Sequence, residues 1–166
     1  MAPEGPGDGC QQQFVTLRLA YRGSERMSGW QRQGPGLEAA TPSVQGLLEQ
    51  ALSSVLGGRQ ALVVQASSRT DRGVHARDQA AVVRLPDGAR IQFCEEDVCH
   101  EEESCLRAPD LVLALNAKLP PDVAVLQCHP ADNRRMTFVA KQYRYYIQQP
   151  PRGATSFKPA ASWRVK

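Results

Sequence analysis

The chain has 166 residues and a mass of 18.2 kDa, which is enough for one ordinary domain with its own hydrophobic core. Hydrophobic residues make up 42% of the sequence and charged residues 22%, a balance that excludes wholesale disorder. No stretch approaches the ~20 consecutive apolar residues that a membrane-spanning helix needs, so we expect no membrane span.

The net charge of +3 is distributed unevenly along the chain. Residues 94–110 hold seven acidic side chains and one arginine, which gives this segment −6 and leaves +9 for the other 149 residues. A basic body suits a protein that binds a polyanion such as RNA, because lysine and arginine displace counterions from phosphate. The alternative is a mildly basic surface with a solvated acidic loop.

The five cysteines have neither the even number nor the paired spacing of a secreted disulfide scaffold. The N-terminus lacks the basic and apolar regions of a secretory signal. We therefore expect a reducing compartment, the cytoplasm, with the nucleus or an organelle as alternatives. The spacing of Cys94, Cys99, His100 and Cys105 fits no usual zinc site, so we expect no metal.

We expect residues 1–13 to form a flexible leader. Apolar side chains alternate over residues 14–21, the period of a half-buried strand. Glycines then interrupt residues 23–36, which we interpret as a long loop that carries Trp30.

A helix is predicted next, with Thr41 as its cap and Pro42 in its first turn. Its apolar stripe has the spacing i, i+3, i+4, i+7, i+8 and i+11 and consists of Val44, Leu47, Leu48, Ala51, Leu52 and Val55. Gly57 and Gly58 end the helix.

The sequence after residue 60 predicts four strands, one helix and two irregular segments. The predicted strands span residues 61–66, 79–85, 123–128 and 142–148, the last with Tyr143, Tyr145 and Ile147 on one face. A short helix is predicted over residues 111–119, where two prolines end it. Residues 67–76 are interpreted as a polar loop and residues 86–109 as an acidic surface insertion.

The order strand, helix, strand, strand, helix, strand, with one more strand, predicts an α+β fold. It is the split β-α-β order of ferredoxin-like domains, with an antiparallel sheet and helices packed on one face. We expect this domain to occupy residues 14–148 and residues 149–166 to form an irregular tail. Such sheets often serve RNA-binding proteins as stacking platforms.

The polar loop that follows the second predicted strand contains one carboxylate among several cations. It reads Ser-Ser-Arg-Thr-Asp-Arg-Gly-Val-His-Ala over residues 67–76, with Arg77 directly after it. Nearby positive charge stabilises the ionised form of a carboxylate and keeps Asp71 available as a base or a nucleophile.

This loop resembles the signature of the TruA-type tRNA pseudouridine synthases, Arg-Thr-Asp-x-Gly-Val-His-Ala. Four further segments resemble motifs of that family and occur in the family's order: residues 29–33, 43–49, 115–125 and 141–145. Together the five motifs extend over residues 14–148 and correspond to the N-terminal half of such an enzyme.

The resemblance implies isomerisation of uridine to pseudouridine in tRNA, with Asp71 as the essential carboxylate and no metal or organic cofactor. Whether Asp71 attacks the sugar or removes a sugar proton stays open at this point. The resemblance and the local charge imply substrate contacts by Tyr143, which would pack against the target base, and by Arg69, Arg72 and His75. The expected RNA-binding residues are Trp30, Arg32, Arg77, Arg134, Arg135, Lys141 and Arg144.

Several of these assignments have a structural alternative. Asp71 is alternatively a turn residue whose carboxylate caps backbone N–H groups. Tyr143 and Tyr145 are alternatively core residues, Trp30 is alternatively a packing anchor for its loop, and His75 is alternatively a structural hydrogen-bonding group.

The sequence also departs from the family pattern at three places. Tyr21-Arg22-Gly23 stands where the family has Tyr-Asp-Gly, and residues 132–135 lack the family's aromatic residue and alanine. The family's second half, which completes the catalytic cleft, has no counterpart here. Three explanations remain: a fragment of a longer gene product, a half that pairs as a homodimer or with a second subunit, and a non-catalytic RNA-binding or RNP-assembly protein.

Overall fold

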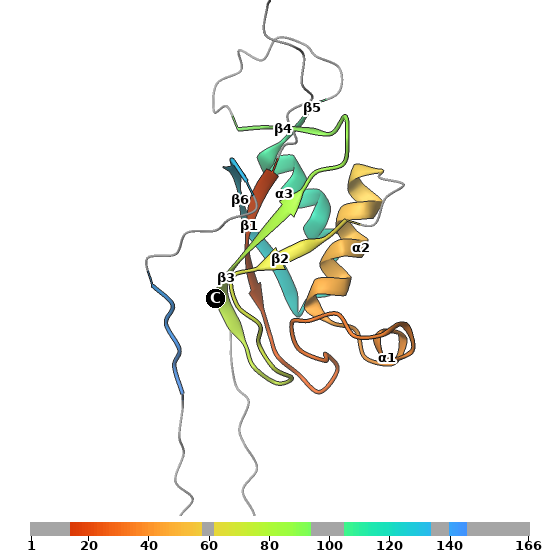
Figure 1. Ribbon diagram of the computed structural model, residues 1–166, viewed down its shortest axis with the longest axis vertical. Coiled ribbons are helices and arrows are strands. Elements are labelled where there is room, and N and C mark those ends of the chain that lie inside the picture. Colours follow the sequence, from red (N-terminus) through yellow and green to blue (C-terminus); the bar gives the residue numbers. More distant parts are fainter. Residues whose placement is uncertain (1–13, 58–61, 94–104, 134–139, 146–166) are drawn as a thin grey trace, which may run out of the picture. The chain divides into compact units, whose positions relative to one another are not determined.

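The computed structural model describes residues 14–57, 62–93, 105–133 and 140–145. The chain divides into two units, residues 1–136 and 137–166. The helices and strands of the described residues all belong to the first unit (Figure 1). The predicted leader at 1–13 and the predicted tail at 149–166 lie outside the described residues, as do residues 94–104 of the acidic segment.

The centre of the first unit is a four-stranded antiparallel sheet. Its strands are β1 (Phe14–Tyr21), β2 (Val64–Ala66), β3 (Ala76–Arg84) and β6 (Val123–Ala131). They lie side by side in the order β2-β3-β1-β6, with every neighbouring pair antiparallel. Together with the helices between them, this arrangement has the split β-α-β order and confirms the predicted α+β fold.

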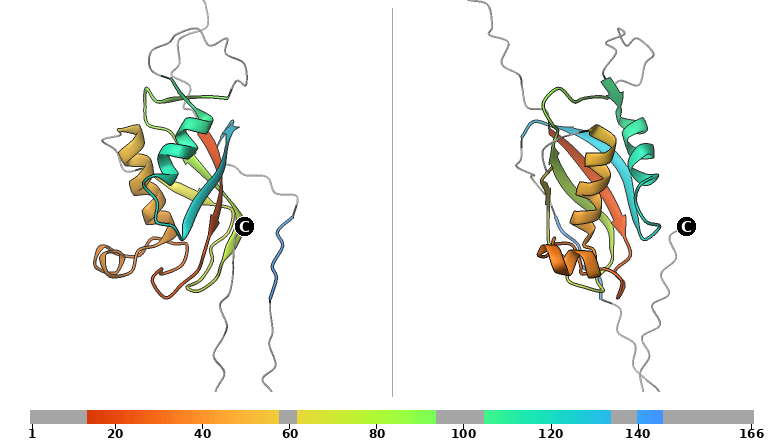
Figure 2. Two further views of the ribbon diagram at one scale, coloured as in Figure 1. Left: turned by 180° about the vertical axis from the view of Figure 1, so that it is seen from behind. Right: turned by 90° about the vertical axis from the view of Figure 1, so that its right-hand side faces the viewer.

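Two helices, α2 (Val44–Leu56) and α3 (Ala108–Asn116), lie against the same face of this sheet (Figure 2). The alternation in β1 turns Val15, Leu17, Leu19 and Tyr21 toward them, and each of these side chains is at most 2% exposed. The helices contribute Val44, Leu48, Leu52, Leu111 and Leu115 to the same core. Hydrophobic burial between these two layers therefore stabilises the unit.

The start of α2 differs from the prediction. Its N-cap is Ser43, whose hydroxyl accepts a hydrogen bond from the Gly46 N–H at 2.9 Å, so the prediction that Thr41 caps the helix is wrong. Thr41 instead follows a short helix, α1 (Pro35–Ala40), which begins at the end of the stretch predicted to be a loop. The predicted end is confirmed, because Gly57 adopts φ 66° as the C-cap.

Both edge strands have one residue whose backbone groups are paired by a helix side chain. On β6 the Asn116 amide donates to the Val125 carbonyl at 2.9 Å and accepts from the Val125 N–H at 2.8 Å. On β2 the Val64 N–H donates to Glu49 and the Val64 carbonyl accepts from Gln45. These side chains satisfy main-chain groups that no neighbouring strand reaches.

The segment predicted as a surface insertion is partly structured. Strands β4 (Arg90–Gln92) and β5 (Cys105–Arg107) pair in parallel, and Ile91 is 3% exposed within the core cluster. Helix α3 begins directly after β5, three residues before its predicted start. None of the helices in the described ranges is long and apolar enough to cross a membrane.

The strand predicted over residues 142–148 does not form in its described part. Gln142 to Tyr145 have no regular secondary structure, and residues 146–148 lie outside the described ranges. Tyr143 is 61% exposed and Tyr145 84% exposed.

Candidate active site on the Asp71 loop

The loop that carries the candidate carboxylate consists of residues 67–75 and joins β2 to β3; we call it the Asp71 loop. Its base is fixed by Gln79, which is 6% exposed. The Gln79 amide accepts a hydrogen bond from the Ser67 hydroxyl at 2.9 Å and donates one to the Ser68 carbonyl. The Ser67 N–H donates to the Ala80 carbonyl at 2.8 Å. The loop therefore starts from a rigid strand end.

Thr70, the residue directly before Asp71, is held at two points. A hydrogen bond of 2.7 Å joins its hydroxyl to that of Tyr21, and its carbonyl accepts from the Trp30 N–H at 2.9 Å. Burial raises the pKa of the Tyr21 phenol although the Thr70 hydrogen bond opposes the shift, so the phenol keeps its proton at neutral pH. The buried end of β1 thus positions the backbone next to Asp71.

The backbone of the Asp71 loop also lies against two glycines of the segment that follows β1. Gly29 has φ +102°, and a Cβ atom there would be 2.7 Å from the Thr70 carbonyl oxygen and 2.9 Å from the Asp71 carbonyl carbon. A Cβ atom on Gly23 would overlap the backbone of Gly73 and Val74. Only glycine leaves room for these two main-chain segments to pack together.

The charged side chains of the loop are open to solvent while its backbone is fixed. Arg69, Asp71, Arg72 and Arg77 are exposed, and His75 is half-buried. The Arg72 guanidinium donates to the Glu25 carbonyl at 2.6 Å, and the Val74 N–H donates to the Asp71 carbonyl at 3.1 Å. An exposed carboxylate on an immobilised backbone, with arginines beside it in the loop, can meet a large anionic substrate without ordering the loop first.

Trp30, predicted to contact RNA, has a buried ring. It is 2% exposed and packs against Tyr21 with 6.0 Å between ring centroids. The carbonyls of Gly29 and Trp30 each accept at 3.0 Å from the first N–H groups of α2, those of Val44 and Gln45. Trp30 thus lies where the alternative interpretation, a packing anchor for its loop, would put it. Its backbone also links the N-terminus of α2 to Thr70.

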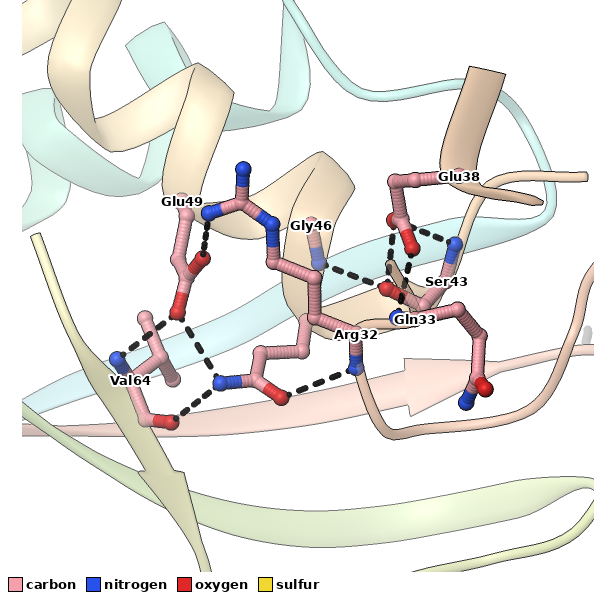
Figure 3. Close-up of polar contacts among 8 residues, drawn as sticks. Arg32, Gln33, Glu38, Ser43, Gly46, Glu49 and Val64 are labelled. Carbon is pink, nitrogen blue, oxygen red and sulfur yellow. Dashed lines mark hydrogen bonds and ion pairs between the residues drawn. The ribbon is translucent and has the colours of Figure 1, made fainter. Parts of the chain in front are cut away.

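Arg32, also predicted to contact RNA, lies beside a buried carboxylate (Figure 3). Its guanidinium is 3.2 Å from Glu49, whose side chain is 9% exposed. Glu49 also accepts from the Gln45 amide at 3.0 Å and from the Val64 N–H at 3.2 Å. Neutralising this carboxylate is therefore a structural role of Arg32, because a buried charge without a counter-charge is strongly destabilising.

A second carboxylate in Figure 3, Glu38 of α1, binds the start of α2. It accepts from the Ser43 N–H at 2.8 Å, the Ser43 hydroxyl at 2.6 Å and the Gln33 N–H at 3.0 Å. Burial by itself would raise the pKa of Glu38, but these hydrogen bonds outweigh it and the pKa is lowered. A Cβ atom on Gly46 would overlap this carboxylate, so a larger residue at that position would displace the Glu38 side chain.

The remaining predicted site residues lie outside the described part of the first unit. Arg134 and Arg135 lie outside the described residues. Lys141, Tyr143 and Arg144 are exposed in the second unit. Within the described ranges, no three His, Cys, Asp or Glu side chains are grouped so as to hold a metal ion.

Residue-by-residue sequence reasoning missed the groups that fix the Asp71 loop. In the sequence, these groups stand out only as parts of a strand, a loop or a motif; they are Tyr21, Gly23, Gly29 and Thr70. The inward position of Tyr21 in the alternating strand was the one available signal, since a buried tyrosine hydroxyl usually finds a hydrogen-bond partner.

No family model matches the chain. Among curated proteins, it is 35% identical over 141 residues to tRNA pseudouridine synthase A of Chlamydia felis, which covers 83% of this chain and 44% of the relative. It is 32% identical over 160 residues to tRNA pseudouridine synthase A of Neisseria meningitidis serogroup C (strain 053442), 94% of this chain and 51% of the relative. With tRNA pseudouridine synthase A 2 of Desulfotalea psychrophila it shares 30% identity over 142 residues, 83% of this chain and 47% of the relative.

The chain thus spans about half the length of the curated relatives that it matches. The similarity extends over most of its own length, which confirms the resemblance read from the motifs.

Proposed function

We propose that this homologue of the tRNA pseudouridine synthases carries the catalytic carboxylate, Asp71, of an enzyme that converts uridine in tRNA to pseudouridine. The observation that carries the proposal is the contrast within the Asp71 loop between an exposed carboxylate and a backbone held by Tyr21, Gly29 and Trp30. A group that must meet a reacting sugar within a few tenths of an ångström needs this kind of support.

The chemistry is an isomerisation that requires no added reactant. The bond between N1 of uracil and C1′ of the ribose breaks, the base turns, and a new bond forms between C5 and C1′. The proton on C5 leaves and N1 gains one, so atoms and electrons balance. An ionised Asp71 serves either of two roles, attack on C1′ or removal of a sugar proton, because both need a carboxylate free of a proton.

The target nucleotide has to leave its stack before its sugar reaches Asp71. The exposed Arg69 and Arg72 are suited to the flanking phosphates, since a guanidinium presents a planar set of donors to phosphate oxygens. We assign Tyr143 to the extruded base. The cleft would be completed by further protein: the remainder of a longer chain, a second copy or another subunit.

The test is release of tritium from an unmodified tRNA transcript labelled at C5 of uridine, because each turnover frees that hydrogen. We expect the wild-type chain to release tritium and Asp71→Asn to lose at least about a thousandfold in rate, as for other essential catalytic groups. Asp87→Asn is the matched control, since Asp87 is exposed on the turn after β3, at the opposite end of that strand from the Asp71 loop.

Equal rates for the wild type and Asp71→Asn would contradict the proposal. Absence of release by the wild-type chain, together with tight and salt-sensitive tRNA binding, would point either to a missing second half or to the non-catalytic RNA-binding alternative.

A further inference from the structure

The segment of residues 22–28, which follows β1, runs beside the Asp71 loop along a fixed path. The Arg22 N–H donates to the Asp122 carbonyl at 2.8 Å, and the Met27 N–H closes a turn on the Ser24 carbonyl at 3.2 Å. Met27 is 4% exposed and anchors the end of the turn in the core. The segment is therefore ordered by its own contacts.

Two contacts fix this segment against the Asp71 loop. The Arg72 guanidinium donates to the Glu25 carbonyl at 2.6 Å. Gly23 lies so close to the backbone of Gly73 and Val74 that no Cβ atom would fit. The surface of residues 22–26 is therefore a direct neighbour of the Asp71 loop.

That surface presents two further guanidinium groups. Arg22 and Arg26 are exposed, and neither forms an ion pair with another residue of the described ranges. Glu25 is the single acidic residue between them in sequence. With Arg69 and Arg72, four arginines belong to these two segments, and the acidic residues in or next to them are Glu25, Asp71 and Asp122.

We propose that residues 22–26 form a second phosphate-binding element next to the Asp71 loop, in which Arg22 and Arg26 bind backbone phosphates of the RNA. The inference rests on the proposed function in that RNA is the polyanion. Contacts of this kind position the nucleic acid without reading its sequence. Because the segment is ordered before binding, little conformational entropy is lost when phosphates dock on it.

The test measures affinity for an unmodified tRNA transcript by fluorescence anisotropy at NaCl concentrations from about 50 to 300 mM, a range over which phosphate contacts dominate the salt dependence. The variants are Arg22→Gln, Arg26→Gln and the double substitution. Arg90→Gln is the matched control, because Arg90 is equally exposed but lies on β4, away from the Asp71 loop. Thermal melting verifies that each variant is folded.

We expect each single substitution to weaken binding roughly three- to tenfold at 100 mM NaCl and to reduce the slope of log affinity against log salt by about 0.7 to 0.9. Arg90→Gln should match the wild type within about twofold, because a phosphate contact acts locally.

Three outcomes would overturn the inference: an unchanged slope in the double variant, an equal loss in Arg90→Gln, or no RNA binding by the wild-type chain. The outcome is separable from that of the proposed function. Binding that depends on Arg22 and Arg26 without tritium release would sustain the phosphate-binding element and refute catalysis by this chain. Tritium release by the wild-type chain with unchanged RNA binding in the double variant would sustain catalysis and refute the phosphate-binding element.

Discussion

Replacing Gly29 with alanine tests whether close main-chain packing fixes the Asp71 loop. Gly29 and Gly73 both have positive φ, +102° and +85°, so alanine is strained at either position. They differ in their surroundings: a Cβ atom on Gly29 would lie 2.7 to 3.0 Å from backbone atoms of Thr70, Asp71 and Arg72, whereas one on Gly73 would meet nothing within 4 Å. The pair separates steric overlap from backbone strain.

The expected magnitudes follow from three contributions. Positive φ costs an alanine about 1–2 kcal/mol, and the lower entropy of the unfolded chain returns about 0.4–1 kcal/mol. The net cost of Gly73→Ala is therefore about 1 kcal/mol. Gly29→Ala adds an overlap with main-chain atoms that cannot rotate away, at about 1–3 kcal/mol. We expect Gly29→Ala to lower the free energy of unfolding by about 3 kcal/mol.

Urea unfolding followed by circular dichroism at 222 nm measures both free energies. Amide hydrogen exchange of Trp30 and Val74 adds a local measurement, because their N–H groups donate to the Thr70 and Asp71 carbonyls. A displaced loop lets these amides exchange faster than those of α2 even where the whole unit stays folded. Equal destabilisation by the two substitutions would refute the reasoning. A uniform rise in amide hydrogen exchange over the whole chain of the Gly29→Ala variant would also refute it.

Three further predictions concern side chains around the sheet. Tyr21→Phe removes one hydroxyl and leaves the Thr70 hydroxyl without its partner; we expect a loss of about 1–2 kcal/mol in unfolding free energy and faster amide exchange confined to the Asp71 loop. Asn116→Ala removes both hydrogen bonds between this side chain and the Val125 backbone, so we expect the free energy of urea unfolding to fall by about 1–3 kcal/mol. Asn116→Leu should show the same loss if the hydrogen bonds are responsible. The pKa of Glu38 is lowered on folding, so its contribution is present above its unfolded pKa near 4.5 and disappears as the pH falls through the lower folded value. Glu38→Gln should accordingly reduce stability by about 1 kcal/mol at pH 7 and by progressively less as the pH falls below 4.5, and a pH-independent loss would contradict this assignment.

The sequence by itself determined the elements whose signals are local. Alternation over residues 14–21 gave β1, and the stripe in residues 44–55 gave α2, because one face of each element is buried. The order of elements was sufficient for the split β-α-β fold. The strand predicted over residues 142–148 failed in its described part because alternation alone does not supply the neighbouring strand with which it must pair.

Only the tertiary structure decided what the side chains of the candidate site contact. Trp30 and Thr70 are 40 residues apart in sequence, yet the Trp30 N–H donates a hydrogen bond to the Thr70 carbonyl. The same holds for two other contacts, the ion pair of Arg32 with Glu49 and the packing of Gly29 against the Asp71 backbone. Both depend on where the loop after β1 runs. No periodicity encodes such contacts, since they depend on the path of each loop in space. For that reason the sequence indicated the chemistry of Asp71, whereas the fold determined which residues hold it in place.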